Sequence, residues 1–314
     1  MFWNVENLFD TQDDSLRNDD AFTPTGDNHW TYGRYLNKQN RLCQTIAAMG
    51  IADGGSLEVP LLVGLAEVEN DIVLRELVNG TSLRKFDYGF VHFDSPDRRG
   101  IDVALLYRRS LYTPFHVQPV NVSDSTRDFF TRDILLVEGC TREGDTLIAI
   151  VVHLPSKRGG SSADKNRLGV AQTLRMVMDT VSVAHPNSAI VVMGDFNASP
   201  GEPEMRKGLA NKNRKANFVN LMASIDAGRG SYKYQDQWTC LDQIIVSENM
   251  VDSSCAIQVR GKAQIFDAGF LLLDDEKFLG KKVFRTYTGM KYNGGYSDHL
   301  PVYIDIETNT GSTD

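Results

Sequence analysis

The chain has 314 residues, of which 41% are hydrophobic and 24% are charged. A membrane-spanning helix, a zinc knuckle and a redox motif are all disfavoured, because no apolar run approaches the roughly 20 residues of a span and the four cysteines include no CxxC pair. The net charge of −8 and the pI near 5.3 argue against an extended basic surface for nucleic acid, although a local group of Lys and Arg could still hold a phosphate.

The first nine residues, MFWNVENLF, alternate as a β-strand does. Asn4 and Glu6 share one face of this strand, where two polar groups would be costly if buried without partners. They therefore indicate a site, or else a solvated sheet edge. No basic or apolar leader precedes the strand, and natural chains seldom begin inside a core strand. We therefore expect that a leader has been removed and that the protein is periplasmic or secreted.

The segment 10–30 is acidic and rich in turn residues, and we expect it to be a functional loop added to the fold. Helical spacing of apolar residues then predicts a helix over 32–49. The apolar run 60–68 predicts a central strand that ends in Glu67. A buried carboxylate at this point needs a cation, a metal or several donors, and Glu69, with the same strand parity, competes for the role.

A short helix is predicted over 71–78, and four strands follow it. The predicted strands cover 88–93, 101–107, 133–139 and 146–154.

Two basic positions flank the last two of these strands. Arg132 precedes one strand and could anchor a phosphate, although an exposed salt bridge is the commoner role of such an Arg. His153 ends the other strand and is followed by Lys157, Arg158 and two glycines. Such a turn can hold a phosphate through point charges and backbone NH groups, or it can be a solvated basic turn.

A second long helix is predicted over 166–183, and the run AIVVMGDFN then delivers Asp195 and Asn197 together from a strand over 189–196. Carboxylate and amide oxygens suit a hard cation, and an amide NH can hold a phosphate oxygen. A capped turn is the alternative, since Asp and Asn are ordinary turn residues.

The C-terminal third repeats the pattern of polar residues beside apolar strands. Asp242 opens a strand over 241–247, where it could fix a histidine tautomer or belong to a turn. A long connection over 260–295 follows, and we expect it to be a second added loop. Asp298 and His299 then immediately precede a strand over 299–306. Helices and strands interleave without a linker or a repeat, which predicts one α/β domain over 1–314.

Taken in order, the motifs WNVENLF, GLAEVEN, RRGIDVALLYR, VVHLPSKRGG, GDFN, LDQIIVS and SDHLP resemble the endonuclease/exonuclease/phosphatase superfamily over almost the whole chain. The resemblance implies a four-layer α/β/β/α sandwich of two mixed sheets flanked by helices. It also implies that Glu67 is the principal Mg²⁺ ligand, with Mn²⁺ or Ca²⁺ as alternatives, and that Asn4, Glu6 and Asp298 lie near the metal.

The resemblance further implies roles in handling phosphate and water. Asp195 and Asn197 would position the attacking water and a phosphate oxygen, and His299, oriented by Asp242, would contact the scissile phosphate or act as base. His153 would be a second phosphate-contacting histidine, which is nearer the deoxyribonuclease and phosphatase branches. From the residues alone, Lys157 and Arg132 are further candidates for phosphate binding.

The expected reaction is in-line attack of water on a phosphodiester of nucleic acid or of a small or lipid molecule. A phosphomonoesterase or a lipid-headgroup hydrolase is the alternative, and a binding module without turnover is the third. The segments 10–30 and 260–295 match no substrate element of the family, so the resemblance identifies no substrate. We expect a monomer.

Overall fold

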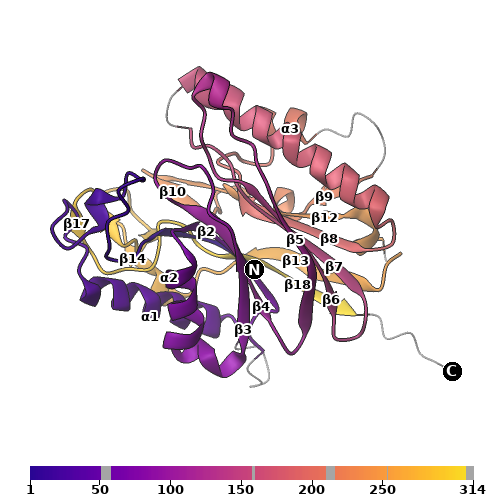
Figure 1. Cartoon of the computed structure of the whole chain (residues 1–314), viewed down its shortest axis with the longest axis horizontal. Helices are drawn as coiled ribbons and strands as arrows, with labels where there is room; N and C mark the ends of the chain where they lie inside the picture. Colours follow the sequence, from indigo (N-terminus) through magenta and orange to yellow (C-terminus); the bar gives the residue numbers. More distant parts are fainter. Residues whose placement is uncertain (51–57, 158–159, 210–215, 253, 309–314) are drawn as a thin grey trace.

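Two mixed six-stranded sheets lie face to face at the centre of the molecule (Figure 1). The computed structural model describes every residue except 51–57, 158–159, 210–215, 253 and 309–314. The first sheet has the strand order β13 (Ile257–Ile265), β18 (Val302–Thr308), β1 (Phe2–Leu8), β2 (Leu62–Val68), β4 (Asp102–Arg108) and β3 (Tyr88–His92). The second has the order β5 (Tyr112–Val120), β6 (Ile134–Thr141), β7 (Thr146–His153), β8 (Ala189–Asp195), β12 (Asp242–Ser247) and β9 (Phe218–Asn220).

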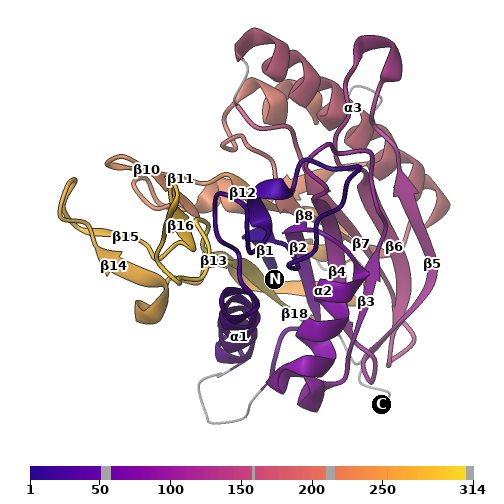
Figure 2. The ribbon, with the colours of Figure 1, turned by 60° about the vertical axis from the view of Figure 1, so that its left-hand side comes forward.

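Helices cover the outer faces of both sheets, which gives the four layers that the family resemblance implies. Helix α3 (Gly160–Ala184) packs its apolar side on the second sheet through residues such as Leu174 and Met178. Helices α1 (Tyr32–Ala48) and α2 (Asp71–Arg75) lie on the far side of the first sheet, as the turned view shows (Figure 2). None of the helices in the described part of the chain combines the length and the apolar character that crossing a bilayer requires.

The shorter helical turns lie in the connections. Two are π turns, Glu76–Gly80 and Glu204–Gly208. The 3-10 turns are Asp20–Phe22, Ser82–Phe86, Ser125–Arg127, Leu221–Ser224, Glu248–Met250 and Gly269–Leu271. The helix predicted over 71–78 is thus an α-helix that ends at Arg75 and continues as a π turn.

Each sheet contains one parallel pair among antiparallel ones, β1 with β2 and β7 with β8. The second pair approaches closely at its carboxyl end. A Cβ atom on Gly194 would lie 2.2 Å from the backbone oxygen of Val152, which no side chain tolerates. The glycine before Asp195 is therefore required by the packing of β8 against β7.

The two segments expected as added loops differ in structure. Residues 10–30 form irregular turns around the ring of Phe22, which stacks on Phe9. The second expectation, a loop from residue 260, begins too early, because β13 continues in the first sheet to Ile265.

Beyond Ile265 the chain forms two small hairpins. They are β14 (Leu272–Asp274) with β15 (Lys281–Val283), and β16 (Tyr287–Thr288) with β17 (Lys291–Tyr292). A third hairpin comes from the segment before β12, namely β10 (Tyr232–Tyr234) with β11 (Gln237–Thr239). The three gather beside one end of the sheets in Figure 2.

Candidate active site

The register of the second sheet brings three of the predicted residues into one row. His153 lies beside Asp195 in the parallel pair, and Asp242 lies opposite Asp195 in the antiparallel one. Because directly paired residues project to the same face of a sheet, the three side chains point the same way. Asp195 meets Asn4 from the first sheet, with 3.0 Å between Asn4 Nδ2 and Asp195 Oδ2, so this face is the interior of the sandwich.

His299 enters this row from the turn before β18. Its Nδ1 lies 2.7 Å from Asp242 Oδ2, and its Nε2 lies 3.8 Å from Asp195 Oδ2. An ionised carboxylate only accepts hydrogen bonds, so Asp242 holds the proton on Nδ1 and leaves Nε2 directed toward Asp195. Burial alone would lower the pKa of His299, but the charges of Asp242 and Asp195 outweigh burial and raise it well above the usual value.

Asp195 is held by donors from both sheets. Besides Asn4, the backbone NH of Asn197 donates to Asp195 Oδ1 over 2.8 Å. Asn197 adopts a left-handed φ of 48°, which Asn tolerates better than most residues, and its side chain donates to the Leu154 carbonyl. Burial raises the pKa of Asp195 to about 7, partly offset by His299. The carboxyl group is therefore poised to exchange a proton near neutral pH.

His153 and Arg132 lie beside this group. His153 Nε2 is 3.5 Å from Asp195 Oδ2, and burial together with the charge of Arg132 lowers the pKa of this histidine well below its usual value. Arg132 donates to Asp97 Oδ2 over 3.0 Å and to the Leu154 carbonyl over 2.8 Å. With only 6% of its surface exposed, Arg132 forms a buried ion pair, so the sequence-based alternative of an exposed salt bridge is wrong.

Glu67 lies in a bulge at the end of β2 with a left-handed φ of 65°. Its Oε2 accepts a hydrogen bond from the backbone NH of Asn7 over 3.0 Å. Among the residues that the structure describes, no cationic side chain forms an ion pair with this carboxylate. Glu69, the competing residue, instead accepts from the Asp10 NH and lines a separate acidic cavity.

Glu6 and Asp298 are joined by an arginine. Arg285 Nε lies 3.2 Å from Glu6 Oε1, and its Nη2 lies 2.9 Å from Asp298 Oδ2. The Thr286 NH donates to the other oxygen of Glu6. Burial and the nearby charge of Asp298 raise the pKa of Glu6 to about 7.

The types of donor atom suit a hard divalent cation. Three carboxylates, from Glu6, Glu67 and Asp298, and the amide of Asn4 supply oxygen atoms, which Mg²⁺ and Ca²⁺ prefer. Glu67 forms no ion pair with a cationic side chain of the described chain, and burial and the charge of Asp298 raise the pKa of Glu6 although Arg285 pairs with both carboxylates. A bound cation would neutralise part of the negative charge of these carboxylates.

Sequence reasoning missed two cations of this region. Lys38, fully buried, donates to Thr286 Oγ1 over 2.7 Å and to the Tyr296 carbonyl over 2.6 Å. Burial lowers the pKa of Lys38 to about 8, although Glu6 and Asp298 raise it. A signal for Lys38 existed, because it lies on the apolar stripe of α1 between Tyr35 and Leu42. Arg285 lies in a long irregular connection that carries no periodic signal.

Lys157 is directed elsewhere. It is exposed, and its ammonium lies 2.7 and 2.8 Å from the two carboxylate oxygens of Glu202. Arg158, the other basic residue of this turn, lies outside the described residues. The structure thus brings together the predicted carboxylates, histidines and Asn197, with Arg132 beside them, but pairs Lys157 with a surface carboxylate.

Comparison with known proteins identifies the family. A model of the endonuclease/exonuclease/phosphatase family matches residues 1–308. A search of curated proteins gives no match.

Solved structures share the fold at low sequence identity. The Bacteroides thetaiotaomicron mannosyl-6-phosphatase Bt3783 is 13% identical, with 98% of each chain covered and a TM-score of 0.60. The human Nocturnin catalytic domain with bound sulfate is 16% identical, with 97% of this chain and 93% of that chain covered and a TM-score of 0.57. D. rerio TDP2 with a single-strand DNA product is 16% identical, with 87% and 92% covered and a TM-score of 0.56. The chain therefore belongs to the endonuclease/exonuclease/phosphatase family and is a hydrolase acting on phosphoester bonds, for which metal dependence is typical of the family.

Proposed function

We propose that the chain hydrolyses a phosphodiester by in-line attack of water, with Mg²⁺ held at Glu67. The observation that carries the proposal is the alignment of Asp242, His299 and Asp195 in the interior of the sandwich. The carboxylate of Asp242 orients the imidazole of His299, whose pKa is raised, and the carboxyl group of Asp195 has a pKa of about 7. Together these groups can accept one proton from water and stabilise one developing negative charge on the phosphate at neutral pH.

Each residue of the row has a separate task. Asp195, held by Asn4 and Asn197, orients the water and accepts its proton as the new P–O bond forms. His299, as the imidazolium that its raised pKa favours, donates from Nε2 to a phosphate oxygen as charge grows there, and Asp242 accepts from Nδ1 and holds the ring in place. A metal ion held by Glu67, with Asn4, Glu6 and Asp298 around it, would neutralise phosphate charge and stabilise the leaving oxygen.

The charge of the site favours a diester over a monoester. A diester carries one negative charge, whereas a monoester carries up to two near pH 7 and needs more cationic groups to neutralise it. Two arginines near the row are already paired, Arg132 with Asp97 and Arg285 with Glu6 and Asp298, and Lys38 is fully buried. They therefore offer little unpaired positive charge to a second phosphate anion.

The roles can be tested on bis(p-nitrophenyl) phosphate with Mg²⁺. The substitutions Glu67→Gln, Asp195→Asn and His299→Gln should each lower kcat/KM by about 10²–10³, because each removes a group that acts on the reacting phosphate or water. EDTA should abolish turnover, and Mg²⁺ should restore it. The exposed Asp128→Asn is the matched control and should keep wild-type rates. Wild-type turnover in the three site variants would contradict the roles.

Substrate class needs a second comparison. Plasmid DNA, sphingomyelin, a phosphoinositide and p-nitrophenyl phosphate should be compared with the diester under the same conditions. Faster cleavage of p-nitrophenyl phosphate or of the phosphoinositide would favour a monoesterase, and cleavage of sphingomyelin a lipid-headgroup hydrolase. No turnover of any substrate, in a protein that still binds Mg²⁺, would favour a binding module.

A further inference from the structure

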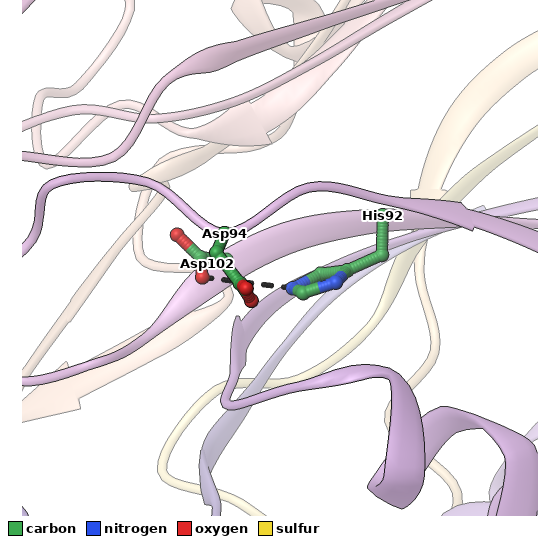
Figure 3. Close-up of side chains that lie close together, drawn as sticks. All are labelled: His92, Asp94 and Asp102. Atoms are coloured by element: carbon green, nitrogen blue, oxygen red, sulfur yellow. Dashed lines mark ion pairs between the residues drawn. The ribbon is translucent and has the colours of Figure 1, made fainter. Parts of the chain in front are cut away.

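A second group of side chains of metal-ligating types lies at the edge of the first sheet that β3 forms. His92 ends β3, Asp102 opens β4, and Asp94 lies in the connection between these strands. One potential ligand atom from each of the three lies within 4.8 Å of the other two, and the side chains turn toward one another in Figure 3.

The imidazole of His92 is oriented as that of a metal ligand is. Its Nδ1 lies 2.9 Å from Asp71 Oδ1, at the start of α2, which directs Nε2 toward Asp102. The side chain is only 2% exposed, and Nε2 has no hydrogen-bond partner among the described residues. Metal-binding histidines commonly donate their other ring NH to a carboxylate in this way.

The spacing of the ligand atoms also fits a metal ion. His92 Nε2 and Asp102 Oδ2 are 3.5 Å apart, which is longer than a strong hydrogen bond. Two ligands of a tetrahedral ion about 2.1 Å from each would be about 3.4 Å apart. The other oxygen of Asp102 accepts from the Ser95 NH over 3.1 Å, which holds the carboxylate in place.

An acidic cavity gives access to the group. A cavity of about 180 Å³ is lined by Asp94 and Asp102 and also by carboxylates of the segment 10–19 and by Glu69. Arg17 is the cationic residue of this lining. The cavity therefore attracts cations and has room for the water molecules that would complete a coordination shell.

The group is distinct from the catalytic row because it lies on the other face of the first sheet. Val103 pairs with Ala66, which in turn pairs with Asn4, and Asn4 points into the sandwich toward Asp195. Asp102 directly precedes Val103 in β4, so its side chain projects to the opposite face of the sheet, which the helices cover. His92 pairs with Ala104 and shares that face, where it meets Asp71 of α2.

We propose that His92, Asp94 and Asp102 form a second metal site, for a first-row transition ion such as Zn²⁺. An imidazole nitrogen with two carboxylates suits these ions better than Mg²⁺ or Ca²⁺, which prefer oxygen ligands alone. Three protein ligands leave at least one position for water from the cavity. The ion would fasten the connection between β3 and β4 to the ends of the two strands that it joins. This connection continues to Asp97, the partner of Arg132, so the ion would support the structure behind that arginine.

The test compares two proteins that both lack the catalytic glutamate, Glu67→Gln and Glu67→Gln/His92→Gln. After removal of metals, each is titrated with Zn²⁺ by calorimetry, and bound zinc is counted after dialysis. The single variant should bind one more equivalent of Zn²⁺ than the double variant. Both proteins keep Asp195, Asp242 and His299, so an ion bound at that group cancels in the comparison.

Three controls keep the test specific. Glu67→Gln/His116→Gln, which removes an exposed histidine of β5, should bind as Glu67→Gln does. Asp94 is exposed, so Asp94→Asn should fold without metal and weaken Zn²⁺ binding at least tenfold. Circular dichroism in EDTA checks folding of each variant. Zn²⁺ should also raise the Tm of the proteins that keep His92.

Equal zinc stoichiometry in Glu67→Gln and Glu67→Gln/His92→Gln would overturn the proposal. His92 would then be an imidazolium that bridges Asp71 and Asp102 and binds no metal. If the double variant does not fold, unchanged Zn²⁺ affinity in Asp94→Asn would overturn the proposal in the same way.

Discussion

Asp242 has one contact on which the proposed chemistry depends, its hydrogen bond to the imidazole of His299. Asp242→Asn keeps the size of the side chain but removes the negative charge that raises the pKa of His299, so the imidazolium that donates from Nε2 is less stable. We expect kcat on the diester to fall by about 10²-fold or more with little change in KM, because binding groups are untouched.

Steady-state kinetics and circular dichroism together check this prediction. Asp242→Glu, which restores a carboxylate, should recover part of the lost rate. A kcat near that of wild type in Asp242→Asn would show that Asp242 does not orient His299 in the reaction.

Among individual residues, the sequence predicts the functional candidates at the ends of strands but misses those whose position depends on the tertiary structure. Asp195, Asp242 and His299 are recognisable because polar residues beside apolar strands stand out. Lys38 is not, because a lysine in a helix normally reaches solvent, and only its place on the buried stripe of α1 marks it. The meeting of His92 with Asp102 depends on the register of β3 against β4, which no local pattern reveals.

Two glycine-to-alanine substitutions, one in β8 and one in α3, compare a closely packed position with an open one. A Cβ on Gly194 would collide with the backbone of β7, whereas a Cβ on Gly169, which is exposed within α3, would point into open space. Gly194→Ala should destabilise the protein by about 1–3 kcal/mol or more, because two backbones must separate. Gly169→Ala should stabilise it by up to about 1 kcal/mol through helix propensity.

Chemical denaturation of the two variants measures both effects. Gly194→Ala should also lower activity, since the strand it displaces carries Asp195. Equal stability of the Gly194→Ala variant and the wild type would show that β7 and β8 can separate without cost.

Apart from β3, which forms an edge of the first sheet, the strands that the sequence predicts lie inside the sheets, and the other edge strands are harder to recognise. The segment YTPFHVQPV is not predicted as a strand because it contains two prolines, yet it forms β5. Proline cannot donate to a neighbouring strand and is tolerated at sheet edges and bulges. β5 lies at the edge of the second sheet, and its register shifts between Pro114 and His116. The expectation of one domain over 1–314 stays a prediction.

For the molecule as a whole, the acidic charge constrains how a polyanionic substrate binds. With a net charge of −8 and paired arginines near the site, we expect contact with only one or two phosphates. KM for a single-stranded oligonucleotide should then rise about tenfold or less between about 50 and 200 mM salt. KM for bis(p-nitrophenyl) phosphate, measured alongside, should change little. A rise of about 10³-fold for the oligonucleotide would indicate an extended phosphate footprint instead.

The pairing of β1 with β18 joins segments that are far apart in the chain. Phe2 pairs with Val302, and Trp3 donates from its indole to the His299 carbonyl, 296 residues away. During synthesis the ribosome therefore releases β1 long before its partner exists. The unpaired edge of β1 is open to other chains until then. Closure of so long a loop is entropically costly, so folding should be slow and His299 should be among the last residues to reach its place.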